Sequence, residues 1–331
     1  MPSRRAPVPR DPRLVVVAIG GNALREPGGL AAPDEWFRAL ERALEPVVDL
    51  VAAGFRIVLT HGNGPQVGDE LLRMELARKT VPPLSLDLCG AETQGSLGYA
   101  IQQVFGNLCR QRGMDVPAAT IVTRVVVDAD DPAFQHPTKP IGPCYTVAKA
   151  RQLQREKGWT LVEETGRGFR RVVPSPRPLR VLEAELVRRL SEGGAVPIAC
   201  GGGGVPVVDT PTGYRGVEAV VEKDYSTERL AAALGADRLL FLTGVDRVAV
   251  AYGTSQAVGI ERLTPPEARA LLAAGEFPPG SMGPKVEAGL RFVEEDGGSE
   301  AIITSLDRVQ PAIDGTAGTH IVRELSRKES R

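Results

Sequence analysis

The stretch Arg13–Leu24, RLVVVAIGGNAL, joins an unbroken apolar run to a pair of glycines. Such a run, rich in valine, is typical of a strand that is buried on both faces of a parallel sheet. The glycines follow at its carboxyl end, and ligands of open α/β sheets bind at this edge. Glycines also let backbone N–H groups approach an anion closely. We therefore predict a strand that ends in an anion-binding loop, although the loop carries no lysine to neutralise the anion.

The same order of strand, glycine loop and helical pattern recurs along the chain. FRIVLT at 55–60 leads into HGNG and a helical pattern, and AVPIAC at 195–200 leads into four glycines. Further strand-like runs, LLFLT at 239–243 and AIITS at 301–305, follow helical patterns. Alternating strands and helices are typical of a mainly parallel sheet with helices on both faces. The predicted fold class is therefore α/β.

One segment, about 125–178, interrupts this order. It contains the proline-rich DPAFQHPTKPIGPCY and then WTLVEETGRGFRRVVPSP, which alternates around Thr165–Gly168 as a β-hairpin does. We interpret this segment as an inserted, exposed flap. The glycines at 201–204 and the turn-rich VDTPTGYRG behind them predict the junction of two lobes. The expected organisation is a disordered tail at 1–12, an N-terminal lobe at 13–210 that carries the flap, and a C-terminal lobe at 211–331.

The composition excludes several classes of protein. The 331 residues include 40 Lys and Arg against 41 Asp and Glu, so no basic excess indicates a nucleic-acid or membrane partner. No apolar run reaches the length of a membrane span, and the start MPSRRAPVPRDPR lacks the apolar core of a secretion signal. The four cysteines form no CxxC pair, and the three histidines show no metal-ligand spacing. We expect a reduced, cytoplasmic protein with no metal held by its own side chains.

Three glycine loops follow predicted strands: Gly20-Gly21-Asn22, Gly62-Asn63-Gly64 and Gly201 to Gly204. A tight turn alone would explain any one of them. Because loops at the carboxyl ends of parallel strands converge on one crevice, three together favour a shared anion site. The sequence GxxxxGK(S/T) is absent and the first loop is not GxGxxG, so neither a standard P-loop nor a dinucleotide fingerprint is present.

The positive charge for such a site has to come from elsewhere in the chain. Lys285 lies in the first turn of a predicted helix, behind the loop GSMGP. Lys223 lies just before a helix that we expect to begin near Ser226 or Thr227. The dipole at a helix N-terminus favours anions, so a lysine at this place makes sense when it and the helix end face a phosphate.

Each of these lysines has a simpler interpretation. Lys223 could form a surface ion pair with Glu222 or Asp224, which is the usual fate of such a residue. Lys139, between prolines in HPTKPIGP on the flap, could be an ordinary solvated lysine, and the residues alone leave both interpretations open. For Lys285 the simple interpretation is weaker, because its placement is unfavourable without an anion.

A series of motifs runs along the chain in this order: VVVAIGGNAL, LTHGNGPQVG, ETQGSLGY, DPAFQHPTKPIGP, RRVVPSP, IACGGGGVPVV, GVEAVVEKD, LTGVD, GSMGPKVEAG and AIITS. In sequence and order they resemble the motifs of carbamate kinases, which belong to the amino acid kinase superfamily. The resemblance covers about Arg13 to Val322, and PTKPIGP and GSMGPK are specific to carbamate kinases within the superfamily. Many relatives in the superfamily carry a lysine in the first loop and carbamate kinases do not, which agrees with its absence here.

The resemblance implies a fold and a reaction. The fold is a three-layer α/β/α sandwich with a mainly parallel central sheet and a small protruding β-hairpin subdomain. The N-terminal lobe binds carbamate and the C-terminal lobe binds the nucleotide. The reaction is direct, reversible phosphoryl transfer between ATP and carbamate, giving ADP and carbamoyl phosphate, with Mg²⁺ carried by the nucleotide. Related enzymes are homodimers, and ATP formation from carbamoyl phosphate in arginine breakdown is the expected role.

The resemblance also implies site residues. Lys139, Lys223, Asp224 and Lys285 match the catalytic charges, and Gly20, Gly21, Asn22, Gly62, Asn63 and Gly64 match the loops that hold the substrate and the phosphoryl group. Lys223, Lys285, Thr243, Gly244, Asp246, Tyr252, Met282 and Gly283 fall in the nucleotide site. Two features depart from the family pattern: Cys144 replaces an aromatic residue, and DYSTERLA after Lys223 is unusually polar.

Other functions remain as alternatives. A different kinase of the superfamily would share the glycine loops and the aspartate but would act on another small acceptor. A non-catalytic, nucleotide-binding regulatory protein could keep the fold, although the intact lysines argue against it. A dinucleotide-dependent oxidoreductase is disfavoured because its fingerprint is missing.

Overall fold

The central sheet is built around β1 (Asp11–Ile19), which contains the apolar run of the opening stretch. The remaining strands of this sheet are β2 (Arg56–His61), β3 (Ala118–Thr120), β9 (Val196–Ile198), β12 (Ala236–Thr243), β15 (Arg262–Leu263), β16 (Glu300–Ser305) and β17 (Thr319–Val322). The computed structural model describes residues 11–20, 33–278 and 280–323, and within these ranges the strand order is β15-β17-β16-β12-β1-β2-β9-β3. The pairs from β16 to β3 are all parallel, whereas β17 is antiparallel to β16. The prediction of a mainly parallel sheet is confirmed.

β1 is buried because helices cover both faces of the sheet. Val15, Val17 and Ile19 belong to one hydrophobic core, and Val16 and Ala18 to the other. All five side chains are fully buried, as the unbroken apolar run predicted. The strand begins at Asp11, two residues earlier than expected, so its first two residues lie within the predicted tail. Residues 1–10 of that tail are outside the described ranges.

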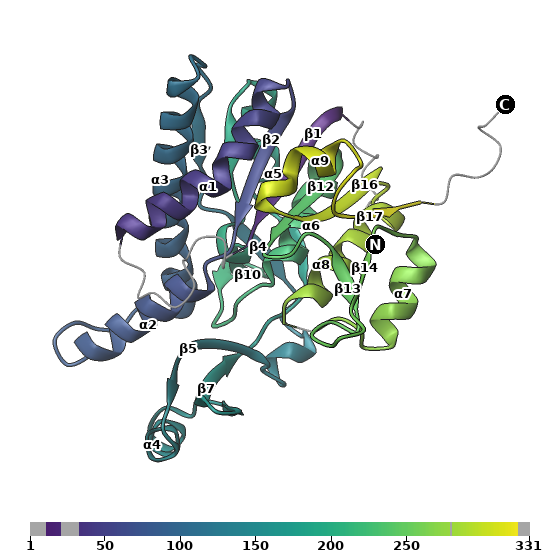
Figure 1. Cartoon of the computed structure of the whole chain (residues 1–331). Coiled ribbons are helices and arrows are strands. Elements are labelled where there is room, and N and C mark those ends of the chain that lie inside the picture. Colours follow the sequence, from purple (N-terminus) through teal and green to yellow (C-terminus); the bar gives the residue numbers. More distant parts are fainter. Residues whose placement is uncertain (1–10, 21–32, 279, 324–331) are drawn as a thin grey trace.

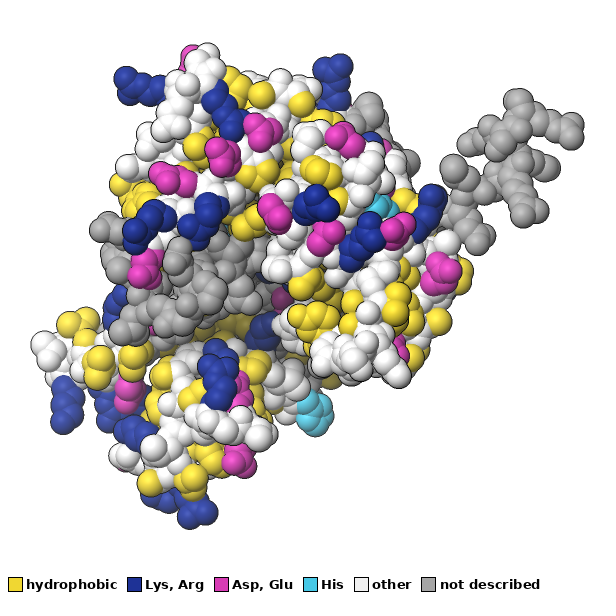
Figure 2. Space-filling model, in the orientation of Figure 1, with side chains coloured by type: hydrophobic (Ala, Val, Ile, Leu, Met, Phe, Trp, Pro, Cys, Tyr) yellow, Lys and Arg dark blue, Asp and Glu magenta, His cyan; other side chains and the backbone are white. Residues whose placement is uncertain are grey.

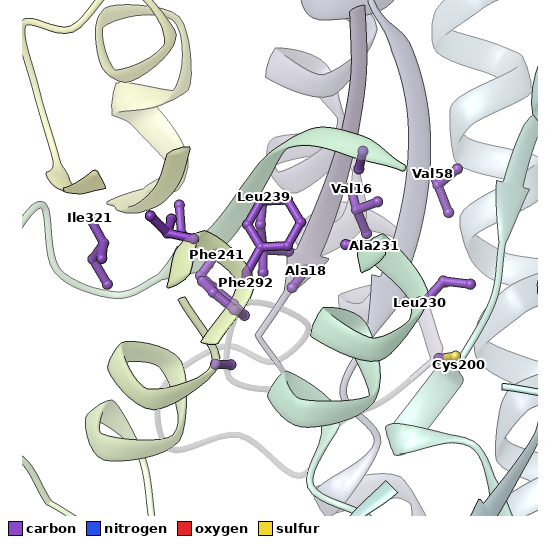
Figure 3. Close-up of a cluster of buried hydrophobic side chains, with 14 of the residues drawn as sticks. Val16, Ala18, Val58, Cys200, Leu230, Ala231, Leu239, Phe241, Phe292 and Ile321 are labelled. Atoms are coloured by element: carbon purple, nitrogen blue, oxygen red, sulfur yellow. The ribbon is translucent and has the colours of Figure 1, made fainter. Parts of the chain in front are cut away.

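Two layers of helices enclose the sheet and complete the predicted α/β/α sandwich (Figure 1). One layer packs on the face of Val15 and contains α1 (Pro33–Ala52), α3 (Leu86–Gln111) and α9 (Val309–Ile313). The other packs on the face of Val16 and contains α5 (Ala184–Glu192), α6 (Lys223–Leu234), α7 (Pro265–Ala273) and α8 (Met282–Glu294). Figure 3 shows this second core, where Leu239 and Phe241 of β12 pack with Phe292 of α8.

A second sheet was not expected from the sequence. It has the order β11-β10-β4-β8 and consists of β4 (Arg124–Val127), β8 (Pro178–Val181), β10 (Val205–Thr210) and β11 (Gly213–Gly216). A separate hairpin is formed by β13 (Val248–Val250) and β14 (Val258–Ile260). Both ends of the segment 125–178 therefore lie in regular strands of the second sheet, and the flap protrudes from that sheet.

The protruding part of the flap is a small αβ unit rather than a hairpin alone. Its strands β5 (Lys139–Tyr145), β7 (Gly168–Val173) and β6 (Leu161–Glu164) form an antiparallel sheet, and α4 (Val147–Lys157) lies between β5 and β6 in the chain. The β6–β7 pair is the hairpin predicted around Thr165–Gly168. Ala150, Leu153 and Leu161 form a core within the unit. Figure 1 shows the unit below the main body, with β5 near α2 (Gly64–Ala77).

The predicted lobes share secondary structure. The expected boundary between residues 210 and 211 lies at the turn of the β10–β11 hairpin, and the β1–β12 pairing joins strands of both lobes in one sheet. Short 3₁₀ turns occur at Pro132–Phe134, Gly201–Gly203 and Leu306–Arg308. None of the helices in the described ranges combines the length and apolar character needed to span a bilayer.

Candidate active site

A cavity of about 540 Å³ lies where the carboxyl ends of β1, β2 and β12 face the flap. Gly20, Gly62 and Thr243 line it from these strand ends, and Lys139 lines it from β5. In Figure 2 the surface is hollowed between the flap, at the bottom, and the main body, and basic and acidic side chains are visible in the hollow. The crevice expected at the strand ends is therefore present.

Gly20 and Gly62 bring the strand ends into close contact. Gly20 N–H donates to Leu242 O over 3.2 Å, and Gly62 N–H donates to Ile19 O over 3.0 Å. A Cβ at Gly20 would lie only 3.0 Å from Leu242 O. These two N–H groups are occupied by backbone carbonyls, so here glycine provides close approach rather than a free anion donor. Gly21 and Asn22 lie outside the described residues.

The third glycine loop closes against the second. Gly202 lines the cavity with φ of +66°, and a Cβ on it would lie 2.1 Å from Asn63 Nδ2. The Asn63 amide is held in place, because Nδ2 donates to Thr93 Oγ1 over 2.8 Å. Asn63 is the N-cap of α2 and makes no side-chain cap bond in the described structure, and Gly64 and Pro65 of the first turn line the cavity. Because Pro65 has no N–H group, Gly64 carries the first N–H of this helix end. Such a helix N-terminus is a ready donor site for anions.

A single buried carboxylate holds two lysines at the cavity. Lys223 Nζ donates to Asp224 Oδ1 over 2.6 Å, and Lys285 Nζ donates to Asp224 Oδ2 over 3.0 Å. Lys223 is 8% exposed and Asp224 is 1% exposed. The simpler interpretation of Lys223 was an ion pair at the surface. Asp224 is indeed its partner, but the pair is buried. The helix was also expected too late, because α6 begins at Lys223 itself and puts both charges in its first turn.

The charges of this cluster shift one another's pKa values. Burial opposes ionisation of Asp224, but the Lys223 and Lys285 ammonium groups outweigh it and hold the pKa of Asp224 below its usual value. Burial also lowers the pKa of Lys223, and Asp224 only partly compensates. Two ammonium groups share one carboxylate, so the cluster retains a net positive charge in a poorly solvated place. This is the charge that the glycine loops lack.

Polar side chains anchor α6 behind the cluster. Ser226 Oγ donates to Gly203 O over 2.7 Å, and Thr227 Oγ1 lies 2.8 Å from the hydroxyl of Thr60 on β2. Both Ser226 and Thr227 are fully buried. The unusually polar sequence DYSTERLA therefore satisfies buried backbone and hydroxyl groups and ties α6 to the third glycine loop.

Lys139 reaches the cavity from the flap. Its ammonium donates to the carboxylate of Glu222, the N-cap residue of α6. The side chains are 29% and 17% exposed, so this pair is largely enclosed. Of the two interpretations left open for Lys139, the solvated surface lysine is excluded. The role of Glu222 as its partner was missed, because 83 residues separate the two in the chain.

His61 is a buried neighbour of the site that sequence reasoning also missed. It ends β2, is 1% exposed, and its Nδ1 lies 3.1 Å from Gly62 O. Burial lowers its pKa to about 4, with the Lys223 charge acting in the same direction and Gly62 O opposing. The imidazole is therefore neutral at pH 7 and donates from Nδ1 to Gly62 O. The sequence feature that could have identified His61 is its place between a buried strand and a glycine loop.

Most of the residues expected at the nucleotide line the same cavity. Thr243, Gly244, Tyr252 and Met282 line it, together with residues that were not predicted, among them Arg247 and Phe277. Two expected residues do not line it. Asp246 accepts a hydrogen bond from Thr304 Oγ1 over 3.3 Å, and Gly283 is buried where a Cβ would lie 3.1 Å from Pro278 O. Cys144 also lies away from the cavity lining, and its thiol donates to Glu164 within the flap.

Known proteins resemble the chain over nearly its whole length. The amino acid kinase family matches residues 13–305. A carbamate kinase of Pyrococcus horikoshii is 44% identical over 312 residues, covering 94% of this chain and 99% of that protein. A carbamate kinase of Thermococcus kodakarensis is 45% identical over 315 residues, covering 94% and 100%. A solved structure of carbamate kinase from Giardia lamblia bound to AMP-PNP has a TM-score of 0.89 at 37% identity, covering 95% of this chain and 99% of that one.

Proposed function

Because the chain belongs to the amino acid kinase family, we propose that it is a carbamate kinase, which transfers a phosphoryl group reversibly between ATP and carbamate. The products are ADP and carbamoyl phosphate. The observation that carries this function is the contact of Asp224 with both Lys223 and Lys285 opposite the glycine loops. Phosphoryl transfer needs such fixed positive charge around the transferred group more than it needs a covalent nucleophile.

The small substrate binds between the glycine loops and the flap. Gly20, Gly62 and Gly202 keep this part of the cavity open by lacking side chains, and the N–H of Gly64 at the N-terminus of α2 donates to the anion. Lys139 contacts the substrate from the opposite side. Because both walls are fixed by short contacts, the reacting groups are held in line, which favours direct transfer.

The nucleotide occupies the end of the cavity lined by Thr243, Gly244, Tyr252 and Met282. Its phosphates extend toward Lys223 and Lys285, whose charges stabilise the negative charge that develops on the transferred phosphoryl group. The binding of AMP-PNP by the related Giardia protein supports a nucleotide in this fold. Asp246 and Gly283 do not line the cavity but support the loops that do. Asp246 accepts from Thr304, and Gly283 allows Pro278 O to approach closely.

Magnesium arrives with the nucleotide rather than from a site of the protein. Of the carboxylates that line the cavity in the described part of the chain, Glu222 and Asp224 both accept from lysines. Mg²⁺ in such sites is held largely by substrate phosphates and water. A nucleotide-bound Mg²⁺ would supply further positive charge at the phosphates, and Lys223 and Lys285 would hold those phosphates from the protein side.

A different acceptor is the main alternative. Carbamate is much smaller than an amino acid, acetylglutamate or a nucleotide, and Lys139 on the flap closes the acceptor end of the cavity. A non-catalytic role is disfavoured because Lys139, Lys223, Asp224 and Lys285 are all present and all line one cavity.

One coupled assay tests these alternatives. ATP formation is measured from ADP and carbamoyl phosphate, beside acetylglutamate and other superfamily acceptors in the opposite direction. Turnover with carbamoyl phosphate alone supports the proposal. Turnover with another acceptor would show that the protein is a different kinase of the superfamily. ADP binding without any turnover would favour a regulatory protein.

Assembly and location are part of the same proposal. We expect a homodimer, for which the exposed apolar side chains Leu72, Leu76, Val81 and Leu88 at α2, α3 and their connection offer a contact surface. Light scattering during size-exclusion chromatography measures the mass directly.

The free cysteines of the described residues agree with a reducing, cytoplasmic location. The division into lobes at 13–210 and 211–331 remains a proposal, with the cavity between them.

A further inference from the structure

Glu222 connects the flap to the catalytic charges. Its side chain accepts from Lys139 of β5, and its backbone caps α6, the helix that starts with Lys223 and Asp224. We infer that Glu222 is a positioning residue: its carboxylate holds Lys139, and with it the flap, over the cavity. The inference rests on the proposed function for its kinetic consequences, but the flap contact can be tested separately.

The backbone of Glu222 is fixed, so its side chain starts from a defined point beside the flap. Its carbonyl accepts from Tyr225 N over 3.1 Å and from Ser226 N over 3.2 Å in the first turn of α6. The residue adopts φ of −65° and ψ of 119°, an extended N-cap conformation. Its side chain is only 17% exposed. A carboxylate held in this way defines one position for the flap lysine.

Lys139 is held on the other side of this contact by the flap. It begins β5, where it pairs with Val173 of β7, and Pro140 after it restricts its backbone to extended conformations. An ammonium group has three donors. Glu222 takes one of them, which leaves donors of the same group to contact a substrate oxygen. Glu222 can therefore orient Lys139 without blocking it.

The charge balance explains why this contact is needed. Lys139, Lys223 and Lys285 line one end of the cavity, and their carboxylate partners are the neighbouring residues Glu222 and Asp224. Without Glu222, three ammonium groups would face one carboxylate, and their repulsion would push the flap away from α6. A bound phosphate compensates this repulsion. The effect of Glu222 on the flap is thus greatest when the cavity contains no ligand.

A second flap carboxylate pair supplies a matched control. Arg171 of β7 lies 3.5 Å from Glu218, which does not line the cavity and is 56% exposed in its side chain. Glu218 Oε1 also accepts from Leu86 N, a bond that glutamine can keep. Glu218→Gln therefore removes one flap-to-body charge contact without altering Lys139. Glu222→Gln removes the charge contact of Lys139 and keeps the size and an acceptor oxygen of the side chain, while the Lys157–Glu75 contact between the flap and α2 is present in both variants.

Hydrogen exchange tests the flap contact without reference to activity. Val220 N–H donates to Pro174 O, directly after β7, so the exchange of the Val220 amide reports whether the base of the flap stays in place. We expect this amide to exchange about tenfold faster in Glu222→Gln than in wild type without ligand, and at the wild-type rate with ADP and carbamoyl phosphate. Glu218→Gln is the comparison. Equal exchange in the two variants, or faster exchange that persists with ligand, would overturn the inference.

Kinetics test whether Glu222 acts through Lys139. We expect Glu222→Gln to lower kcat/KM for carbamoyl phosphate by about tenfold, because Lys139 is less often in place, while KM for ADP stays within about twofold. In the Lys139→Gln background, Glu222→Gln should cause no further loss. An additive loss would show that Glu222 acts independently of Lys139 and would overturn the inference. Inactive wild-type protein would instead refute the proposed function, and the exchange experiment would still judge the flap contact.

Discussion

Lys285 Nζ lies 3.0 Å from Asp224 Oδ2, although the two residues are 61 positions apart in the chain. Because Lys223 Nζ lies 2.6 Å from the other oxygen of the same carboxylate, one buried aspartate fixes two ammonium groups. The contact also joins the N-terminus of α8 to that of α6, so the two helix ends face the cavity together.

Lys285→Ala should lower turnover by about 100- to 1000-fold, because it removes a charge that stabilises the transition state. Coupled ATP formation from ADP and carbamoyl phosphate measures the loss. Lys79→Ala, which removes an exposed lysine after α2, is the control and should behave as wild type. Near-normal turnover of Lys285→Ala would exclude this lysine from catalysis.

Asp224→Asn should also lower turnover by about 100-fold, but for a different reason. The amide keeps the shape of the side chain and loses the charge that holds both lysines, so the ammonium groups repel each other. Since Asp224 raises the pKa of Lys223 against the effect of burial, the pKa of Lys223 should fall further in the variant. The rate at alkaline pH should therefore decline at lower pH than in wild type. An unchanged pH–rate profile would contradict this explanation.

Gly202→Ala should reduce activity, because a Cβ would lie 2.1 Å from Asn63 Nδ2 and would displace that side chain from the cavity wall. Gly113→Ala is a matched control: Gly113 has φ of +69°, close to the +66° of Gly202, and has open space around it. In both variants the alanine has to adopt a left-handed backbone conformation, which destabilises the folded state by about 1 kcal/mol. Only Gly202→Ala should lose turnover and further stability, as measured by urea unfolding and the coupled assay. Equal losses in the two variants would mean that strain alone matters.

His61→Asn should flatten the pH dependence of stability. The pKa of His61 is about 4 in the folded protein, below the ordinary value of 6.5, so the unfolded chain binds more protons between these pH values. Stability is therefore lost as the pH falls through this window, by on the order of 2 kcal/mol between pH 7.5 and pH 5. The asparagine amide can still donate to Gly62 O and does not titrate. Free energies of unfolding at the two pH values measure the difference, and an equally steep loss in the variant would contradict it.

Several features could be predicted because they depend on neighbouring residues. The apolar run of β1 indicates burial on both faces, and alternation around Thr165–Gly168 indicates the β6–β7 hairpin. Lys285 was correctly placed in the first turn of α8, but the expected loop GSMGP was too long, because its last three residues already belong to the helix. The glycine loops were expected at the carboxyl ends of strands, and Gly20, Gly62 and Gly202 line one cavity there.

Other features could not be predicted because distant residues create them. The start of α6 was placed too late, since its first turn is polar and lacks apolar periodicity. Ser226 is tolerated there only because Gly203 O accepts its hydroxyl, 23 residues away in the chain. The second sheet was missed for a similar reason: β4 and β8 pair across the whole flap, and their short runs resemble loop edges in the sequence.

The sequence by itself determined the layered α/β fold, the positions of the glycine loops and the types of charged residue that line the cavity. These depend on local apolar patterns and on the conformational freedom of glycine, which adjacent residues are enough to specify. Only the tertiary structure decided the partners of the charges: Asp224 with Lys285, and Glu222 with Lys139. Such pairs depend on distance and burial, because removal from water makes each charge require a nearby opposite charge, and the fold brings these residues together from remote parts of the chain.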